Sequence, residues 1–474
     1  MTKFSTQIQG LREFFATGET FSTSWRQTQL DAMIHMLESE RESIQQALHQ
    51  DLGKTAEEAW LTEIGIVLHE ARHARKHVKA WASGRKKRTP IFLFPASSHI
   101  QPQPRGLSLI ISPWNYPFQL MISPLIASIA AGNVALIKPS ELAPATASWF
   151  EQKLPQYLDK RSIAVVQGGP DETTELLTEK FDTIFFTGST RVAKFIARAA
   201  AEHLTPTVLE LGGKSPVVIT HCKNLDIAAK RLAFAKFVNA GQTCVAPDYV
   251  LIEDDLCDDF VARLKAEISK QFGQNFERMG HLINDRHYNR LKGLLHPAEG
   301  AAMPEQTILC GGKCDDDARV IEPTIIQVGM DHPLMQEEIF GPILPILPIS
   351  KTHAQIAGGS KDLSTAQMAL DIIAQHPTPL ACYLFSSDKA DFKAFKKLIC
   401  GGFALNDALM HLTNIHMPFG GVGNSGHGAS HGYQGFLNFS HQRSELLQSA
   451  GIDVPLRYPP YSSRAMKLFG WLMR

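Results

Sequence analysis

One cysteine of the chain stands in a setting that favours nucleophilic chemistry. Cys244 lies in the segment NAGQTCVAP (239–247), among small and polar residues and after a glycine. Such neighbours leave a sulfur atom accessible, and an accessible thiolate attacks carbonyl carbon readily. A lone cysteine is more often a small buried hydrophobe. Cys244 is therefore a candidate nucleophile only if other groups support it.

Two further residues supply what a thiol nucleophile needs. Glu210 ends an apolar run and is followed by two glycines, so its carboxylate is a candidate general base. Asn115, in PWNYPF (113–118), follows another apolar run and can direct an amide N–H at developing negative charge. The alternatives are a solvated charge at a strand end for Glu210 and an Asx-turn before a proline-rich bend for Asn115.

Two other segments have the features of a dinucleotide site. FTGST, which contains Gly188 and Ser189, follows a predicted strand and opens a predicted helix, so its backbone N–H groups can hold a phosphate. KPSE runs from Lys138 to Glu141 at the end of another strand, where open α/β sheets bind ligands. Glu141 can accept hydrogen bonds from ribose hydroxyls and should repel a 2′-phosphate, which favours NAD over NADP.

Two glycine-rich patterns are not assigned a function. GGVGNSGHG (420–428) contains G-x-G-x-x-G, but no clear strand precedes it and no helical pattern follows, so it is interpreted as a glycine-rich loop. GGKS (212–215) resembles the end of a P-loop, but Val208 stands where the first glycine is required.

No metal site is expected. Cys310 and Cys314 form a C-x₃-C pair without a second ligand pair. His411 and His416 are too far apart for an i,i+4 pair and lack the glutamate of H-E-x-x-H.

The segments between the motifs alternate between two kinds of periodicity. Short β-rich runs predict strands at 107–112, 134–138, 163–167, 183–186, 207–211, 216–220 and 248–252. Helical spacing of apolar residues predicts helices at 26–49, 56–82, 190–202 and 225–239. Strand–helix alternation indicates right-handed βαβ units, mainly parallel sheets and an α/β fold.

Composition narrows the class of protein. The 474 residues include 47 Lys and Arg and 47 Asp and Glu, so the net charge of zero argues against a nucleic-acid partner. The basic run at 85–88 is interpreted as a solvated turn. Seven cysteines in so long a chain indicate a reducing compartment, and charges interrupt the N-terminus where a signal peptide would be apolar. We expect a cytoplasmic protein.

Two apolar segments raise the question of a membrane. Residues 106–137 carry no charge, but three prolines break any single helix, so a buried strand–loop–helix is expected. The tail RAMKLFGWLMR (464–474) is too short to span a bilayer. It can make a weak contact with a membrane surface or pack on a partner subunit.

The motifs together resemble the aldehyde dehydrogenase superfamily. PWNYPF, KPSE, FTGST, LELGGKSP, GQTC, EEIFGP and PFGGVGNSG occur in the family's order, and the spacing from Glu210 to Cys244 also matches. GQTCVAPDYV, FGGVGNSGHGASHG and the late RYPPY are most similar to the class 3 group, which includes fatty-aldehyde and coniferyl-aldehyde dehydrogenases. The resemblance covers about residues 5–460.

The resemblance implies NAD(P)-dependent oxidation of an aldehyde to a carboxylic acid. Cys244 would be the catalytic thiolate and form a thiohemiacetal and then a thioester. Glu210 would activate the water that hydrolyses the thioester. Asn115 and the backbone N–H of Cys244 would form the oxyanion hole.

The resemblance also implies the residues that contact the cofactor, which is NAD, with NADP as the alternative because class 3 enzymes can use both. Lys138 and Glu141 would contact the adenosine ribose. Gly188 and Ser189 would form the phosphate turn. Glu338 would hold the nicotinamide ribose, with Phe340 packing nearby, and Trp114 would also contact the cofactor. The chain departs from the common family pattern at Ala193, where glycine is frequent.

The fold implied by the resemblance has three parts and a tail. A Rossmann-like cofactor domain would span 1–83 and 104–210, and an α/β catalytic domain 211–401. A small β-arm at 84–103 and 402–445 would join a second subunit in a homodimer. The C-terminal tail would be 446–474.

Two alternatives to this function are kept. An acylating aldehyde dehydrogenase or acyl reductase would use the same thiol but pass the acyl group to coenzyme A or run in reverse. A catalytically silent structural relative would be expected to lose Cys244 or Glu210, and both are present.

Overall fold

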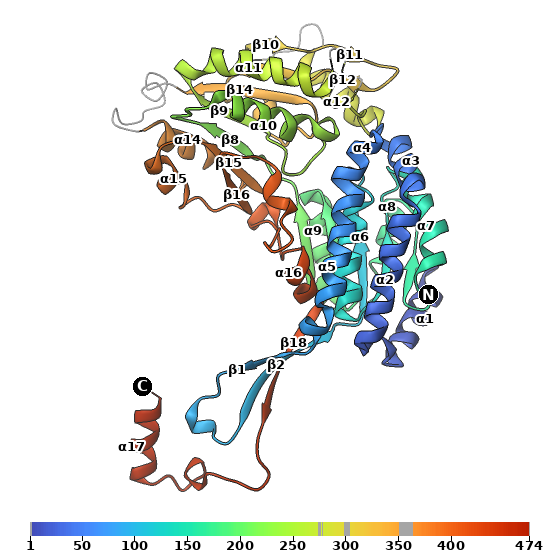
Figure 1. The fold of residues 1–474 in the computed structure, drawn as a ribbon, viewed down its shortest axis with the longest axis vertical. Helices are drawn as coiled ribbons and strands as arrows, with labels where there is room; N and C mark the ends of the chain where they lie inside the picture. The colour runs from blue at the N-terminus through green and yellow to red at the C-terminus, as the bar shows by residue number, and fades with distance from the viewer. Residues whose placement is uncertain (1, 274–275, 277, 298–303, 350–363, 474) are drawn as a thin grey trace.

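The computed structural model describes residues 2–273, 276, 278–297, 304–349 and 364–473. Two sheets flanked by helices form the body, and a three-stranded sheet extends from it toward the C-terminal helix (Figure 1). The predicted α/β class is confirmed. The seven predicted strands are all present, with ends shifted by at most two residues.

The first sheet has six strands in the order β17-β7-β6-β3-β4-β5. They are β3 (Leu107–Ile111), β4 (Val134–Lys138), β5 (Ile163–Val165), β6 (Thr183–Gly188), β7 (Thr207–Leu211) and β17 (Gly426–His427). Only β17 is antiparallel to its neighbour. From β3 the chain proceeds to β4 and β5 on one side, and from β6 to β7 on the other. Such a reversal opens a crevice at the carboxyl ends of β3 and β6.

The uncharged segment 106–137 lies inside this first unit. It forms β3, a loop, α6 (Gln119–Ala131) and β4, and nearly every residue is buried. Helices α2 (Thr23–Ser39) and α5 (Gly65–Ala82) pack against α6. The expected buried strand–loop–helix is confirmed. Among the described residues, no helix combines the length and apolar character needed to cross a bilayer.

The second sheet has seven strands in the order β10-β13-β14-β9-β8-β15-β16. They are β8 (Pro216–Ile219), β9 (Tyr249–Glu253), β10 (Gln306–Cys310), β13 (Thr324–Val328), β14 (Ile343–Ile349), β15 (Ala381–Phe385) and β16 (Gly402–Leu405). Its helices include α10 (Leu225–Phe237), α11 (Asp254–Phe272), α12 (Asp285–Leu295), α14 (Thr365–Ile373) and α15 (Lys389–Phe395).

The segment expected as the second part of the arm, 402–445, is divided among three places. Its first strand, β16, pairs with β15 and belongs to the second sheet. The short strand β17 pairs with β7 in the first sheet, and α16 (Gly432–Asn438) packs on α6. Only β18 (Ser440–Leu447) joins the small sheet. The boundary expected at 402 is wrong for β16, because its backbone completes the ladder of β15.

The long N-terminal helices are interrupted. The predicted helix 26–49 consists of α2 and α3 (Arg41–Leu52), since Glu40 leaves helical geometry. The predicted helix 56–82 consists of α4 (Ala56–Ala59), a π-turn at Trp60–Ile64 and α5. A π-turn inserts one residue into the helical repeat, which periodicity alone does not reveal.

The remaining elements complete the two units. They are α1 (Ser5–Ala16), α7 (Pro144–Tyr157), α8 (Pro170–Leu176), α9 (Thr190–Glu202), β11 (Cys314–Asp315), β12 (Val320–Ile321) and the 3₁₀ turns at Glu19–Phe21, Val238–Gly241, Pro333–Met335, Met410–Thr413, Gly423–Ser425 and Pro455–Arg457.

A smaller lobe projects from the body. Its sheet has the order β1-β2-β18, with β1 (Arg85–Lys87) and β2 (Ser97–Pro104). The C-terminal helix α17 (Ser463–Leu472) lies at its far end, next to the 3₁₀ turn η3 (Ile91–Leu93) (Figure 1). We call residues 84–104 and 440–474 the terminal lobe.

Candidate active site

Cys244 follows a tightly wound turn. Asn239 and Ala240 have positive φ angles of 54° and 51°, and Gly241 has a φ of 74°. A Cβ atom at Gly241 would overlap the carbonyl of Gly341, so only glycine allows these two backbones to approach. Packing within the unit built on the second sheet therefore fixes the turn. The turn presents Cys244 to the unit built on the first sheet.

The thiol of Cys244 is half-buried where it lines the adjoining cavity. Burial raises its pKa far above the usual value, and the nearby carboxylates of Glu338 and Glu210 raise the pKa further. The raised pKa favours the neutral thiol over the thiolate. Its activation requires a group that takes the proton, and the surrounding carboxylates are the available acceptors.

The loop after β3 is tied to the cysteine turn. The Asn115 side-chain amide donates to the carbonyl of Gln242 at 3.0 Å, and the Asn239 amide donates to the Asn115 carbonyl at 2.7 Å. The hydroxyls of Tyr116 and Thr243 are 2.6 Å apart. Asn115 is buried within this network and is not among the residues that line the adjoining cavity. Two units of the chain thus hold one rigid site.

A buried ion pair between the segment after α3 and the π-turn at Trp60–Ile64 supports the same loop, and the sequence analysis did not identify it. Lys54 and Glu63 are both fully buried and bonded to each other. The Lys54 ammonium also lies 4.0 Å from the centre of the Tyr116 ring. The other Glu63 oxygen accepts the backbone N–H groups of Phe118 and Gln119, at the start of α6. The sequence did contain a signal of buried charge, because Glu63 and Glu70 lie on the apolar face of the predicted helix 56–82.

Glu210 lies on β7, beside the glycine-rich segment. Gly426, in β17, pairs with Glu210 in β7. A Cβ at Gly426 would overlap the carbonyl of Leu209. The structure agrees with the interpretation of this segment as a loop rather than a dinucleotide fingerprint. Its short strand β17 forms the edge of the first sheet, next to β7. The glycines are needed because backbone lies directly against backbone.

The Glu210 carboxyl group is an unusually weak acid. It is 4 % exposed, and its Oε1 atom has no hydrogen-bond partner. Burial raises its pKa to about 7, the Ser430 hydroxyl lowers the pKa, and the charge of Glu70 raises it. A carboxyl group that titrates near neutral pH can take and release a proton under physiological conditions.

Cys244 and Glu210 line the same cavity, of about 200 Å³. Most of its lining is apolar and comes from the π-turn, α6, α10 and the 409–419 segment. The apolar lining includes Leu61, Ile66, Leu120, Pro124, Phe185, Phe234, Val245, Leu409, Met410, Leu412 and Phe419. The polar groups that accompany the thiol and carboxyl include Tyr116, Gln119, Ser123, Thr243, Ser430 and His431. The cavity can hold a largely apolar molecule with a polar end near sulfur.

The four residues expected at the adenosine end lie at the carboxyl ends of β4 and β6. Lys138 Nζ is 3.4 Å from a Glu141 oxygen, and Glu141 is exposed. Ser189 caps α9, accepting the N–H of Val192 at 3.4 Å. Gly188 precedes it at the end of β6. Position 193, where glycine is frequent in the family, holds a buried alanine on α9.

This crevice contains features that a dinucleotide would satisfy. The hydroxyls of Ser112, after β3, and Thr187, on β6, are buried without a hydrogen-bond partner. A Cβ at Gly188 would lie 2.5 Å from the Phe186 ring, so a larger residue there would have to displace that ring. Unpaired polar groups beside a helix N-terminus fit a phosphate and ribose.

Glu338, Phe340 and Trp114 form a separate group near the thiol. The Glu338 carboxylate accepts the N–H of Gly213 at 3.3 Å, and a Cβ at Gly212 would overlap it. Burial raises the pKa of Glu338 to about 8. The rings of Trp114 and Phe340 meet edge to face, with centroids 5.3 Å apart. The structure thus places the expected nicotinamide-end residues around the cysteine turn and the adenosine-end residues at the sheet.

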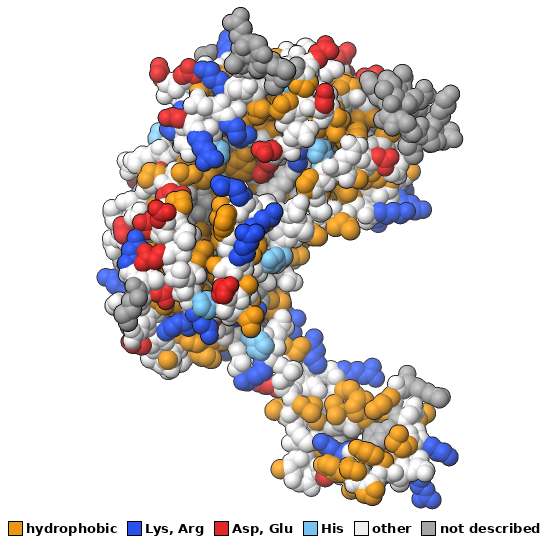
Figure 2. Space-filling model, turned by 180° about the vertical axis from the view of Figure 1, so that it is seen from behind, with side chains coloured by type: hydrophobic (Ala, Val, Ile, Leu, Met, Phe, Trp, Pro, Cys, Tyr) orange, Lys and Arg blue, Asp and Glu red, His pale blue; other side chains and the backbone are white. Residues whose placement is uncertain are grey.

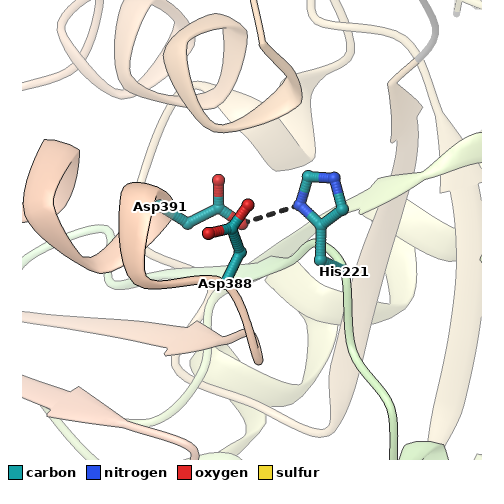
Figure 3. Close-up of side chains that lie close together, drawn as sticks. All are labelled: His221, Asp388 and Asp391. Carbon is teal, nitrogen blue, oxygen red and sulfur yellow. Dashed lines mark hydrogen bonds and ion pairs between the residues drawn. The ribbon is translucent and has the colours of Figure 1, made fainter.

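A third cluster of titratable side chains lies away from this site (Figure 3). His221 Nδ1 donates to an Asp391 oxygen at 2.9 Å, and Asp388 lies beside them. The same Asp391 oxygen accepts the hydroxyls of Thr220 and Ser386. Asp391 raises the pKa of His221, which favours an imidazolium. Its hydrogen bonds make this cluster a structural junction of β8 and α15 rather than a vacant metal site.

Comparisons with known proteins identify the family of the chain. Residues 6–444 match the aldehyde dehydrogenase family. The chain is 43 % identical over 458 residues to the 4,4'-diaponeurosporen-aldehyde dehydrogenase of Staphylococcus aureus, covering 96 % of this chain and 95 % of that protein. It is 40 % identical over 470 residues to the dimeric NADP-preferring aldehyde dehydrogenase of Rattus norvegicus, covering 97 % and 98 %.

A solved structure extends the likeness to three dimensions. The substrate-bound state of Staphylococcus aureus AldH superposes with a TM-score of 0.93, at 41 % identity, over 100 % of both chains. Sequence, fold and the grouping of a thiol with a carboxyl in one cavity lead to the same conclusion. The chain belongs to the aldehyde dehydrogenase family.

Proposed function

We propose that this aldehyde dehydrogenase, which uses NAD or NADP, forms a covalent intermediate on Cys244 and releases a carboxylic acid. The observation that supports this reaction is that Cys244 and Glu210 line one apolar cavity. A nucleophile and a base that titrates near neutrality are the two groups that acylation and hydrolysis require.

In the first step, Cys244 Sγ forms a bond to the aldehyde carbon. The thiol proton passes to a base, for which Glu210 is the proposed acceptor. The oxygen of the resulting thiohemiacetal is held by the backbone N–H of Cys244 and by the Asn115 amide. Asn115 already donates to Gln242, two residues before the nucleophile, so this amide is positioned before the substrate arrives.

When bound, NAD or NADP accepts the hydride that leaves the tetrahedral carbon. The acyl group then remains on Cys244 as a thioester. Glu210 first releases the thiol proton to solvent and is again a carboxylate. It then takes a proton from water, the water oxygen attacks the thioester carbon, and the C–S bond breaks, after which the proton on Glu210 passes to the leaving sulfur. The acid leaves and the thiol is restored.

The cofactor contacts proposed from the sequence remain those at the crevice of the first sheet. Lys138 and Glu141 would contact the adenosine ribose, and Gly188 and Ser189 the phosphates. Glu338, Phe340 and Trp114 would contact the nicotinamide end. We propose NAD as the preferred cofactor, because Glu141 repels a 2′-phosphate, although one relative is named NADP-preferring.

The proposed substrates are aldehydes with an apolar chain or ring. The support is the lining of the cavity, in which apolar side chains predominate around the two reactive groups. One relative is named 4,4'-diaponeurosporen-aldehyde dehydrogenase. Burial of an apolar chain here would bring about 25 cal/mol for each Å² removed from water.

We propose a homodimer in which the first unit binds the cofactor, the second carries the nucleophile and the small sheet joins the subunits. Within the described residues β18 pairs only with β2, so one edge of this sheet is open to a further strand. A relative is named dimeric. The seven cysteines are all free thiols, which supports the proposed cytoplasmic location, where a reducing environment keeps Cys244 active.

An aldehyde panel tests the proposal. The purified protein is given NAD and aliphatic or aromatic aldehydes, and both NADH and the product are measured. We expect the free acid without coenzyme A, and no NADH from Cys244→Ala. Production of acyl-coenzyme A only when coenzyme A is added would instead establish the acylating alternative. Activity of Cys244→Ala at the level of the unaltered protein would exclude this thiol as the nucleophile.

A further inference from the structure

His431 has a backbone conformation that is rare for a residue with a side chain. Its φ is 71° and its ψ is 136°, directly before α16. Only glycine adopts this region readily, so the backbone is strained here and the surrounding structure must hold it in place. Such strained residues cluster at functional sites. The strain at this position places an imidazole in the wall of the cavity that contains Cys244.

The imidazole of His431 faces a buried carboxylate. Its Nδ1 atom lies 4.0 Å from Oε2 of Glu70, a residue of α5 that is 2 % exposed. The backbone N–H of Gly432 donates to the other Glu70 oxygen at 3.1 Å, and the Ser123 hydroxyl donates to Oε2. Because a carboxylate at this distance stabilises an imidazolium, the pair can take up a proton inside the protein.

This pair lies next to the proposed base. Apart from burial, the two groups that act on the pKa of Glu210 are the Ser430 hydroxyl and the Glu70 carboxylate. Ser430 directly precedes His431 in the chain, and Glu210, Ser430 and His431 all line the cavity. These residues therefore form a polar strip in a lining that is otherwise mostly apolar.

The proposed reaction requires a group that takes a proton from Glu210. After acylation Glu210 carries the thiol proton, and it must become a carboxylate again before it can act on water. It is 4 % exposed, and an acyl chain on Cys244 would occupy the apolar space through which water reaches it. An acceptor in the cavity wall would remove the proton while the site stays closed.

We propose that His431 is the proton acceptor that returns Glu210 to its carboxylate form, with Glu70 as the counter-ion of the imidazolium. The inference rests on the function proposed above. The Glu210 carboxyl group gives one proton to the Ser430 hydroxyl, which passes its own proton to the His431 imidazole. The imidazolium then loses one proton to solvent, so the three groups end each turnover as they began it.

Two other imidazoles near His431 do not compete for this proton. Burial lowers the pKa of His411 and of His73 to about 4, so both stay neutral at pH 7. His73 instead continues the row of imidazoles outward. A Cβ at Gly432 would lie 4.0 Å from its Nε2 atom, and its ring centroid is 5.0 Å from that of the exposed His416. Figure 2 shows histidine side chains, in pale blue, at the surface of the body above the terminal lobe.

Replacing His431 with glycine tests the proposal and leaves the backbone unstrained. His431→Gly should still give a burst of NADH, while steady-state turnover should fall about 10²-fold because Glu210 stays protonated. Imidazole added to the buffer should raise turnover about tenfold, since it can enter the space left by the side chain and accept the proton. The control is His427→Gln, which alters an exposed histidine of the same segment and should keep full activity.

His431→Gln separates proton transfer from packing. Glutamine fills the cavity wall but cannot carry the proton, so turnover should fall as in His431→Gly and imidazole should not restore it. Three results overturn the proposal: full turnover in either variant, a loss in His431→Gly that imidazole does not restore, or a change confined to KM for the aldehyde. A missing NADH burst in the unaltered protein would instead refute the covalent intermediate on Cys244 itself.

Discussion

Asn115 donates its side-chain amide to the carbonyl of Gln242 at 3.0 Å, which joins the loop after β3 to the turn that holds Cys244. The donor belongs to the first unit and the acceptor to the second, 127 residues later. This hydrogen bond is one of several that join the proposed oxyanion donor to the segment carrying the nucleophile, with Asn239–Asn115 and Tyr116–Thr243.

Replacing Asn115 with alanine should lower kcat about 10²- to 10³-fold, because one donor to the oxyanion is lost. Steady-state kinetics gives this number. The rate at which iodoacetamide alkylates Cys244 distinguishes a structural effect: it should stay the same if Asn115 acts on the oxyanion. A large rise in alkylation would mean that the residue mainly holds the cysteine turn.

Glu210→Gln should separate acylation from hydrolysis. The amide cannot take a proton from water, so the thioester should accumulate and turnover should fall about 10²- to 10⁴-fold. Stopped-flow absorbance should still show a burst of NADH, and mass spectrometry should show the acyl group on Cys244. Turnover at the original rate would exclude Glu210 as the base for hydrolysis.

Hydrolysis should depend on pH with a midpoint near 7. Glu210 acts as a base only when ionised, and burial raises its pKa to about 7, so the deacylation rate should rise as pH passes upward through this value. Glu70→Gln removes a nearby negative charge and should move the midpoint down. Ser430→Ala removes a hydrogen bond to the carboxylate and should move it up. Single-turnover decay of the acyl-enzyme across pH measures these shifts.

The choice of cofactor should depend on Glu141. Its carboxylate lies beside Lys138 and is exposed to the crevice, so a 2′-phosphate would meet a negative charge. Glu141→Gln should lower KM for NADP about tenfold, which corresponds to about 1.4 kcal/mol, with a smaller change for NAD. If the variant changes both KM values equally, Glu141 does not read the 2′ position.

The buried Lys54–Glu63 pair should contribute strongly to stability. Lys54→Met leaves the Glu63 charge buried without a partner, which should cost about 3–5 kcal/mol of unfolding free energy. Urea denaturation measures the cost. The exposed pair Arg72–Glu38 is the control, because Arg72→Met should cost less than about 1 kcal/mol. Equal costs would show that burial of the first pair is unimportant.

The linear sequence determined the local elements and the order of the motifs. Apolar runs such as 134–138 and 207–211 predicted strands with almost unchanged ends, since a strand covered on both faces must be apolar throughout. It also indicated that polar residues at the ends of such strands, Glu210 and Lys138 among them, would collect at one edge of a sheet.

Long-range packing decided the rest. The π-turn at Trp60–Ile64, the assignment of β16 to the second sheet and the buried Lys54–Glu63 pair depend on contacts between segments far apart in the chain. The pKa of Glu210 has the same origin, because it reflects water excluded by neighbours from other elements. Residue types and spacing are local properties, whereas burial, pairing and electrostatic environment arise only when distant segments meet.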